Sequence, residues 1–261
     1  MSLPFNKIII ILTLSLGILA CEKDESSEEE CTNTEEGLRI NFSTNWGGEA
    51  FDLFETYLNA TEYNVILEQF KFYISDIILV KDNGEEVLLS DVELYDFLNN
   101  KTQKLFDIPA GSYQGIKFAW GVPVELNGTG DPDFDPTIYD VDHPLNTDNA
   151  MYWGWQPGYR FIVFDGRYDT SPDTGGDIPE TFSIHTGTDT CYAPIEALDI
   201  PFNYQDGQLR TIDVNIDIEK AFYSSSDTID LAVDNQSHGT NIQLALRLTR
   251  NIDLASTYTI E

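Results

Sequence analysis

Apolar and polar residues alternate strictly in several parts of this chain, and this pattern limits the possible fold more than any other feature. In residues 212–218 (IDVNIDI) and 38–43 (LRINFS), every second residue is apolar. Because successive side chains of a strand point to opposite faces, the pattern predicts strands with one buried and one solvated face. Further strands are predicted at residues 66–80, 86–97, 112–120, 158–165, 180–185, 196–204 and 241–249.

Helical periodicity is confined to residues 51–58 and 218–223, where we expect only short turns. Turn-forming sequences such as Asp82-Asn83-Gly84 separate several of the predicted strands. Roughly eight to ten short strands without alternating helices are typical of a β-sandwich. The sequence therefore predicts an all-β protein, an antiparallel β-sandwich with long functional loops, in which residues 32–261 form a single domain.

The N-terminal residues predict export and a lipid anchor. Residues 1–20 have a short basic start followed by an apolar run that is too short to span a bilayer, which is typical of a signal peptide. Cys21 follows Ala20 directly, as in a bacterial lipoprotein, and residues 21–31 form an acidic tether. We expect a lipid anchor in the cell envelope, at the outer membrane, with exposure at the cell surface as one arrangement. The alternative is a plain signal peptide with an incidental cysteine.

The cysteine count predicts a disulfide. The chain has three cysteines, Cys21, Cys31 and Cys191. If Cys21 carries lipid, two thiols remain, and an oxidising envelope compartment favours their pairing. We therefore predict a bond between Cys31 and Cys191, with two separate thiols as the alternative.

The net charge excludes one class of partner. The chain carries 45 acidic and 14 basic residues, for a formal net charge of −31. Such a surface repels the phosphates of nucleic acids, so no nucleic-acid partner is expected.

Three histidines suggest a metal site. His143, His185 and His238 all stand in loop-like sequence, and Met151 offers a soft thioether nearby in the aromatic segment 149–161 (NAMYWGWQPGYRF). Imidazole and thioether ligands suit copper. Their spacing matches no metal motif, so solvated or capping histidines remain the alternative.

The acidic loop 124–150 offers a second metal. Four carboxylates take positions 1, 3, 5 and 12 of a calcium-type window, although Pro136 stands where that motif needs glycine. Calcium is therefore a possible cofactor, and a solvated acidic turn is the alternative. The four residues are Asp131, Asp133, Asp135 and Asp142.

Nucleophilic catalysis has little support in the sequence. Ser183 stands two residues before His185, on the same face of a predicted strand, but no acid is evidently placed to orient the histidine. The chain has no GxSxG motif. We therefore expect a protein that is not an enzyme.

Five segments of the chain, taken in order, match the pattern of one known family: LEQFKFYISDIILV (67–80), GSYQGIKFAWGVPVELN (111–127), DHPLN (142–146), MYWGWQPGYRF (151–161) and IHTGTDTC (184–191). The MYWxWxxGYxF pattern is the most specific part. Together these segments resemble the MbnP-like family of copper-binding proteins of bacterial envelopes, and the resemblance covers roughly residues 38–251.

The resemblance implies an extracytoplasmic β-sandwich that binds copper through histidine. His143 and His185 fall in the matching histidine motifs, whereas His238 lies where the family pattern is looser. The resemblance also implies a partner, a MauG-like di-haem enzyme that oxidises a tryptophan to kynurenine. Trp153 and Trp155 are the candidates for that modification.

A different class of function remains open at this point. Exposed aromatic side chains on the loops of a β-sandwich are suited to glycans or to a protein partner. In that alternative the protein is a surface lipoprotein that binds through loop aromatics and holds no copper.

Overall fold

The computed structural model describes residues 35–154, 156–171, 178–225, 227–238 and 241–261. The predicted signal peptide, the tether, Cys21, Cys31 and Trp155 lie outside the described residues. Residues Thr34–Glu261 belong to one compact unit. Among the described residues, no helix has the length and apolar character required to cross a membrane.

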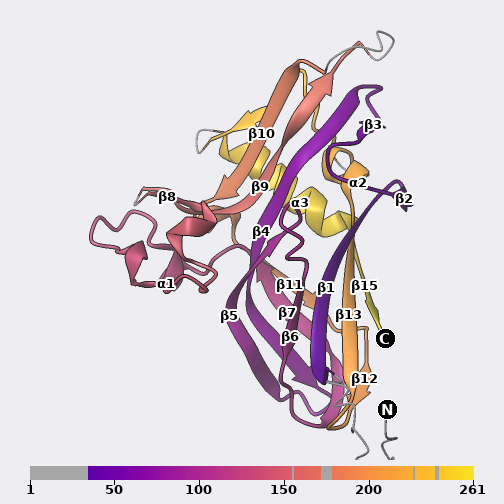
Figure 1. Ribbon diagram of the computed structural model, residues 1–261, viewed down its shortest axis with the longest axis vertical. Helices are drawn as coiled ribbons and strands as arrows, with labels where there is room; N and C mark the ends of the chain where they lie inside the picture. Colours follow the sequence, from indigo (N-terminus) through magenta and orange to yellow (C-terminus); the bar gives the residue numbers. More distant parts are fainter. Residues whose placement is uncertain (1–34, 155, 172–177, 226, 239–240) are drawn as a thin grey trace, which may run out of the picture. The chain divides into compact units, whose positions relative to one another are not determined.

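In the described residues, the smaller of two sheets consists of five strands. Its strands β1, β13 and β15 run next to one another (Figure 1). β1 and β13 lie side by side in parallel, with Gly37 opposite Leu209, and the other pairs of this sheet are antiparallel. Polar side chains bridge the parallel pair on its solvated face, where Asn41 Nδ2 donates to Asp213 Oδ1 at 2.6 Å. The strands are β1 (Gly37–Trp46), β2 (Glu49–Ala50), β6 (Gln103–Phe106), β13 (Leu209–Asp217) and β15 (Ser256–Ile260).

The larger sheet has ten strands and is built around the 18-residue strand β4. Its main path runs β11-β7-β4-β9-β10-β14, while β3 and β5 pair with β4, β12 with β7, and β8 with β9. The strands are β3 (Thr56–Leu58), β4 (Asn64–Lys81), β5 (Glu86–Asp96), β7 (Gly111–Trp120), β8 (Tyr152–Gly154), β9 (Gly158–Asp169), β10 (Glu180–Gly187), β11 (Ala193–Ala197), β12 (Phe202–Tyr204) and β14 (Gln236–Ser237).

Aromatic side chains fill the space between the two sheets. The ring of Phe42 on β1 lies 5.0 Å from that of Phe72 on β4 and 4.5 Å from that of Tyr95 on β5. Trp120 on β7 closes the same cluster, 5.9 Å from Phe42. The all-β class and the sandwich are thus confirmed. The sheets are mixed rather than purely antiparallel, because β1–β13 and β10–β14 are parallel pairs.

The prediction of a strand at residues 241–249 is wrong, because this segment begins helix α3 (Ile242–Ala255). Asn241 caps the helix: its side chain accepts a hydrogen bond from Leu244 N. Leu244, Leu248 and Ile252 are buried at helical spacing, and the apolar residues between them mimic a strand pattern. The other helices are α1 (Val124–Asn127) and α2 (Ile218–Phe222).

A second, smaller core lies beneath the loop that follows α1. Met151, Leu145 and Tyr159 are fully buried in it. The buried side chain of Asn127 accepts a hydrogen bond from Tyr159 N at 2.8 Å and donates one to Asp189 Oδ1 at 2.9 Å. This core fixes the loop 124–150 and strand β8 against β9.

Candidate functional site

Strands β9 and β10 place an acid, a hydroxyl and an imidazole on one face of the larger sheet. Phe182 and Ile184 of β10 point into the main core, so Ser183 and His185 share the opposite face. Ser183 lies directly opposite Asp165 of β9, and His185 lies two residues further along β10. Diagonal neighbours of this kind are within reach of long side chains.

Both polar neighbours of His185 use the same ring nitrogen. His185 Nε2 lies 2.8 Å from Asp165 Oδ1 and 3.2 Å from Ser183 Oγ. The Ser183 hydroxyl donates to the same carboxylate oxygen at 2.7 Å. The N–H of His185 is therefore on Nε2 and donates to Asp165, which leaves Nδ1 as an acceptor with a free lone pair.

Within the described residues, His185 Nδ1 has no hydrogen-bond partner, although His185 is buried, with 7% of its surface exposed. A small cavity of about 10 Å³ lies beside the ring, which is room for one water-sized atom. Trp153, Thr188 and Ile242 are among its lining residues, so β8 and the start of α3 both reach it. An orphaned buried nitrogen beside such a space is the strongest sign of a ligand in this part of the molecule.

Strand β14 brings His238 to the same place. Its two residues pair in parallel with Ser183 and Ile184, so the following residue, His238, lies beside His185. The two imidazole centroids are 5.1 Å apart, with an angle of 33° between the planes. His238 Nε2 lies 3.0 Å from Ser183 Oγ, and Nδ1 lies 3.3 Å from the Gln236 side-chain nitrogen.

Trp153 of β8 completes the group. The centroid of its indole lies 5.3 Å from His185 and 6.2 Å from His238. Arg160 of β9 pairs with Met151, just before β8. Its guanidinium carbon lies over the Trp153 indole, 5.6 Å from the ring centroid. Arg160 also donates to the carbonyl of Ala150, which holds the cation over the indole.

The surroundings shift the ionisation of two groups in this site, Asp165 and His238. Burial opposes ionisation of Asp165, but hydrogen bonds from His185 and Ser183 hold the pKa of its carboxyl below the ordinary value. Burial, and then the neighbouring His185, lower the pKa of His238. At neutral pH His238 is therefore neutral and able to bind a metal ion.

His143 is placed elsewhere. Its ring stacks on Tyr139 at 4.3 Å, and its Nδ1 accepts a hydrogen bond from Leu145 N at 3.0 Å. Neither contact reaches His185, His238 or Trp153. The structure thus pairs His185 with His238, where the family resemblance pairs it with His143.

Met151 and the aspartates of the acidic loop do not join His185 and His238. The Met151 side chain is fully buried in the second core, beside Tyr159. In the loop, Asp131 and Asp135 cap their own turns, because their carboxylates accept from the backbone N–H groups of Asp133 and Thr137. In the described part of the chain, no set of three or more His, Cys, Asp or Glu side chains is grouped as a metal site.

Cys191 is buried, with 1% of its surface exposed, and burial raises the pKa of its thiol. Within the described residues it forms no disulfide. The predicted partner, Cys31, lies outside them, so the Cys31–Cys191 bond stays a prediction.

The serine, histidine and aspartate do not form a hydrolytic relay. In such a relay the acid binds one ring nitrogen and the hydroxyl binds the other. Here Asp165 and Ser183 both face Nε2 of His185. The arrangement orients the His185 imidazole, and the Ser183 hydroxyl donates to Asp165 rather than to this ring.

Sequence reasoning missed Asp165 and Arg160. Both lie in the strand that follows the aromatic turn, at positions where a polar residue interrupts an apolar run. That interruption is the signal available in the sequence. Their pairing with β10 and β8 was needed to show what they contact.

Comparison with known proteins agrees with the resemblance noted from the motifs. The sequence model of the MbnP family matches residues 35–242. Curated proteins give no significant match. Among solved structures, MbnP from Methylosinus trichosporium is similar to the chain, with 15% sequence identity and a TM-score of 0.45 over 73% of this chain and 78% of that chain.

Proposed function

Because the chain belongs to the MbnP family, we propose that it is a copper-binding protein of the bacterial cell envelope, with its site at His185 and His238 beside Trp153. One observation carries the proposal: two imidazoles lie together, and within the described residues the buried Nδ1 of one of them has no hydrogen-bond partner. We propose a binding protein rather than an enzyme.

The donor set fits a copper ion. Imidazole nitrogen is a ligand that copper prefers, and a protein site for cuprous ion needs few ligands. A metal-binding histidine commonly donates its other ring N–H to a carboxylate, which fixes the tautomer and makes the ligand more basic. Asp165 has this role toward His185, so Nδ1 of His185 is the nitrogen that would bind copper.

We further propose that Trp153 is the site of oxidative modification. Conversion of an indole to kynurenine adds two oxygen atoms across the C2–C3 bond, and hydrolysis then releases formate. Two molecules of hydrogen peroxide supply these oxygens and leave two molecules of water. A MauG-like di-haem partner is the expected catalyst, and the new amine and carbonyl would face the two imidazoles.

The N-terminal sequence supports a location at the membrane surface. Residues 1–21 resemble a lipoprotein signal with its lipidated cysteine. A lipid anchor at Cys21 in the outer membrane would place the copper site in an oxidising compartment, where a di-haem partner could reach it.

Anaerobic titration with Cu(I) tests the proposed site. We expect His185→Ala and His238→Ala each to weaken binding by more than about 100-fold, beyond the loss typical of an outer-shell residue. His143→Ala is the matched control and should bind as the wild type does. Equal losses in His143→Ala and His185→Ala would contradict the assignment, and so would a wild-type protein that binds no Cu(I).

Mass spectrometry tests the modification separately. Protein from the native envelope should show a peptide in which Trp153 has lost one carbon atom and gained one oxygen atom. The Trp153→Phe variant should show no such change in this peptide. A fully unmodified Trp153 in native protein would contradict this part of the proposal and leave the copper site untouched.

A further inference from the structure

His238 reaches the site on a long connection between α2 and α3. We call residues 227–238 of this connection the strap. Its last part forms β14 and is held to β10 by two backbone pairs. Such a short strand has little stability of its own, so other contacts must hold the strap in place.

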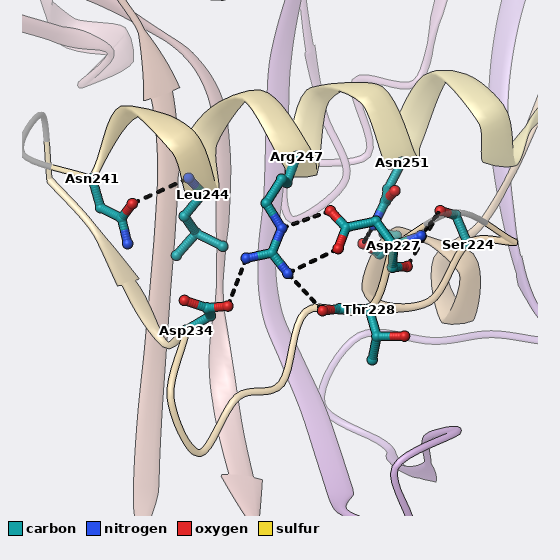
Figure 2. A network of polar contacts seen from close by, with 9 residues as sticks. Ser224, Asp227, Thr228, Asp234, Asn241, Leu244, Arg247 and Asn251 are labelled. Atoms are coloured by element: carbon teal, nitrogen blue, oxygen red, sulfur yellow. Dashed lines mark hydrogen bonds and ion pairs between the residues drawn. The ribbon is translucent and has the colours of Figure 1, made fainter.

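Ile229 and Leu231 of the strap are fully buried in the main core. Arg247 of α3 supplies polar contacts on both sides of these two residues (Figure 2). Its guanidinium forms a two-pronged ion pair with Asp227, with Nε–Oδ2 and Nη2–Oδ1 distances of 2.6 and 3.0 Å. Nη1 donates to Asp234 Oδ2 at 2.6 Å, and Nη2 also donates to the carbonyl of Thr228 at 2.6 Å. One side chain therefore binds the beginning and the middle of the strap.

The contact at Asp234 is adjacent to the segment that carries His238. The next residue, Asn235, accepts a hydrogen bond from Ser183 N at 2.8 Å and donates its side-chain amide to Tyr168 OH at 3.0 Å. Ser183 in turn contacts His238. Arg247 is thus connected with His238 through Asp234, the adjacent residue Asn235 and Ser183, by hydrogen bonds and by the chain between Asp234 and Asn235.

Charge makes Arg247 difficult to replace. Its side chain is 30% exposed and those of Asp227 and Asp234 are 25% and 24% exposed, so these charges are only partly screened by water. Without the guanidinium, two carboxylates would face each other without a cation between them. A lysine would keep the charge but could not bind both carboxylates and the carbonyl with a planar fork.

We propose that Arg247 is a positioning residue that holds the strap so that His238 lies beside His185, and that it thereby sets the copper affinity. This inference rests on the proposed copper site. A ligand that is in place for only a fraction of the time weakens the apparent affinity by that fraction. Loss of the clamp, by which we mean the contacts of Arg247 with Asp227, Thr228 and Asp234, therefore reduces the copper affinity without removing a ligand.

Hydrogen exchange of the metal-free protein tests the positioning directly. In Arg247→Met, the amide of Ser183, which is bonded to Asn235 O, should exchange about tenfold faster than in the wild type. Amides of β1 that pair with β13 should keep their protection. Arg250→Met is the control for the loss of a positive charge near Asp227, because Arg250 is exposed on the same helix and the hydrogen bonds to Asp227, Thr228 and Asp234 come from Arg247. Unchanged protection of Ser183 in Arg247→Met would overturn the proposal.

A double-mutant cycle tests the effect on copper. Arg247→Met should weaken Cu(I) binding on the order of tenfold in the wild type and have no effect in the His238→Ala background. Equal weakening in both backgrounds would show a general structural role and contradict the proposal. Arg247→Lys and Asp234→Asn provide milder variants in case Arg247→Met does not fold. If the wild type binds no Cu(I), the proposed function fails, while the exchange result still decides whether Arg247 holds the strap.

Discussion

Asp165 and His185 stand on neighbouring antiparallel strands, and the Oδ1 of Asp165 lies 2.8 Å from the Nε2 of His185. This single contact determines which nitrogen of the imidazole carries the proton. It also directs the free lone pair of Nδ1 away from the acid. The first prediction follows from it.

Replacing Asp165 should weaken copper binding without removing a ligand. We expect Asp165→Ala to cost about 10- to 100-fold in Cu(I) affinity, since the His185 tautomer is no longer fixed. Asp165→Asn keeps an oxygen that can accept from Nε2, so its loss should be smaller. Competition titration with a Cu(I) chelator measures both. An unchanged affinity in Asp165→Ala would contradict the role given to this carboxylate.

A buried ion pair next to the start of the aromatic segment 149–161 should be important for the stability of the fold. Lys71 and Asp96 are 8% and 2% exposed and lie 2.9 Å apart, and Lys71 Nζ also donates to Asn149 O at 3.0 Å. Lys71→Met leaves an uncompensated buried carboxylate, so the free energy of unfolding should fall by about 3–5 kcal/mol.

Chemical denaturation measures this loss. Lys81→Met is the control, because Lys81 pairs with Glu85 at the surface and its loss should leave the free energy of unfolding nearly unchanged. The double variant Lys71→Met with Asp96→Asn should recover part of the stability. Equal effects of Lys71→Met and Lys81→Met would show that burial of the pair is unimportant.

The turn within the aromatic segment 149–161 depends on a close approach at Gly158. This residue has φ +71°, and a Cβ placed there would collide with the side chain and carbonyl of Asn127. Gly84 has a similar φ of +83° but open space around it. Both substitutions to alanine carry the cost of a left-handed backbone at a residue with a Cβ, about 1–2 kcal/mol, and only Gly158→Ala adds the collision.

Gly158→Ala should therefore lower the melting temperature clearly more than Gly84→Ala. It should also change the fluorescence of the nearby tryptophans, because Gly158 pairs with Gly154 next to Trp153. Comparable melting temperatures for the two variants would mean that Asn127 gives way at no cost.

The ionisation of Asp227 should make the free energy of unfolding fall at low pH. The hydrogen bond from Arg247 holds the pKa of this carboxyl below its ordinary value. An acid with a lowered folded-state pKa stabilises the fold above its unfolded pKa of about 3.9, and the effect disappears as pH falls through the folded value. Wild type should therefore lose more stability between pH 5 and pH 2 than Asp227→Asn does.

Asp253, which is on helix α3 with Arg247, should affect the pH dependence of stability in the opposite direction from Asp227. Burial raises the pKa of its carboxyl, so the ionised form opposes folding at neutral pH. Asp253→Asn should be more stable than the wild type at pH 7, and this difference should vanish in acid. Urea denaturation at a series of pH values measures both variants. A parallel pH dependence of the two would contradict the assigned signs.

Much of the architecture was predictable from the sequence. The alternating segments at residues 38–43 and 212–217 are strands, because a half-buried sheet requires a period of two. The predicted strand at residues 66–80 is part of β4. The segment 241–249 was not predictable from alternation alone. The spacing of its leucines is compatible with a strand and with a helix. The helix is favoured by the cap at Asn241 and by packing of α3 against β10.

The sequence by itself determined the sheet-forming segments, the family, and His185, His238 and Trp153 among the candidate residues. Only the tertiary structure decided that His238 rather than His143 lies beside His185, that Asp165 orients the ring, and that Arg247 holds the strap. The physical reason is that these partners are far apart in the chain. Their meeting depends on which strands pair and in what register, and that is decided by packing across the whole sheet and not by any local pattern.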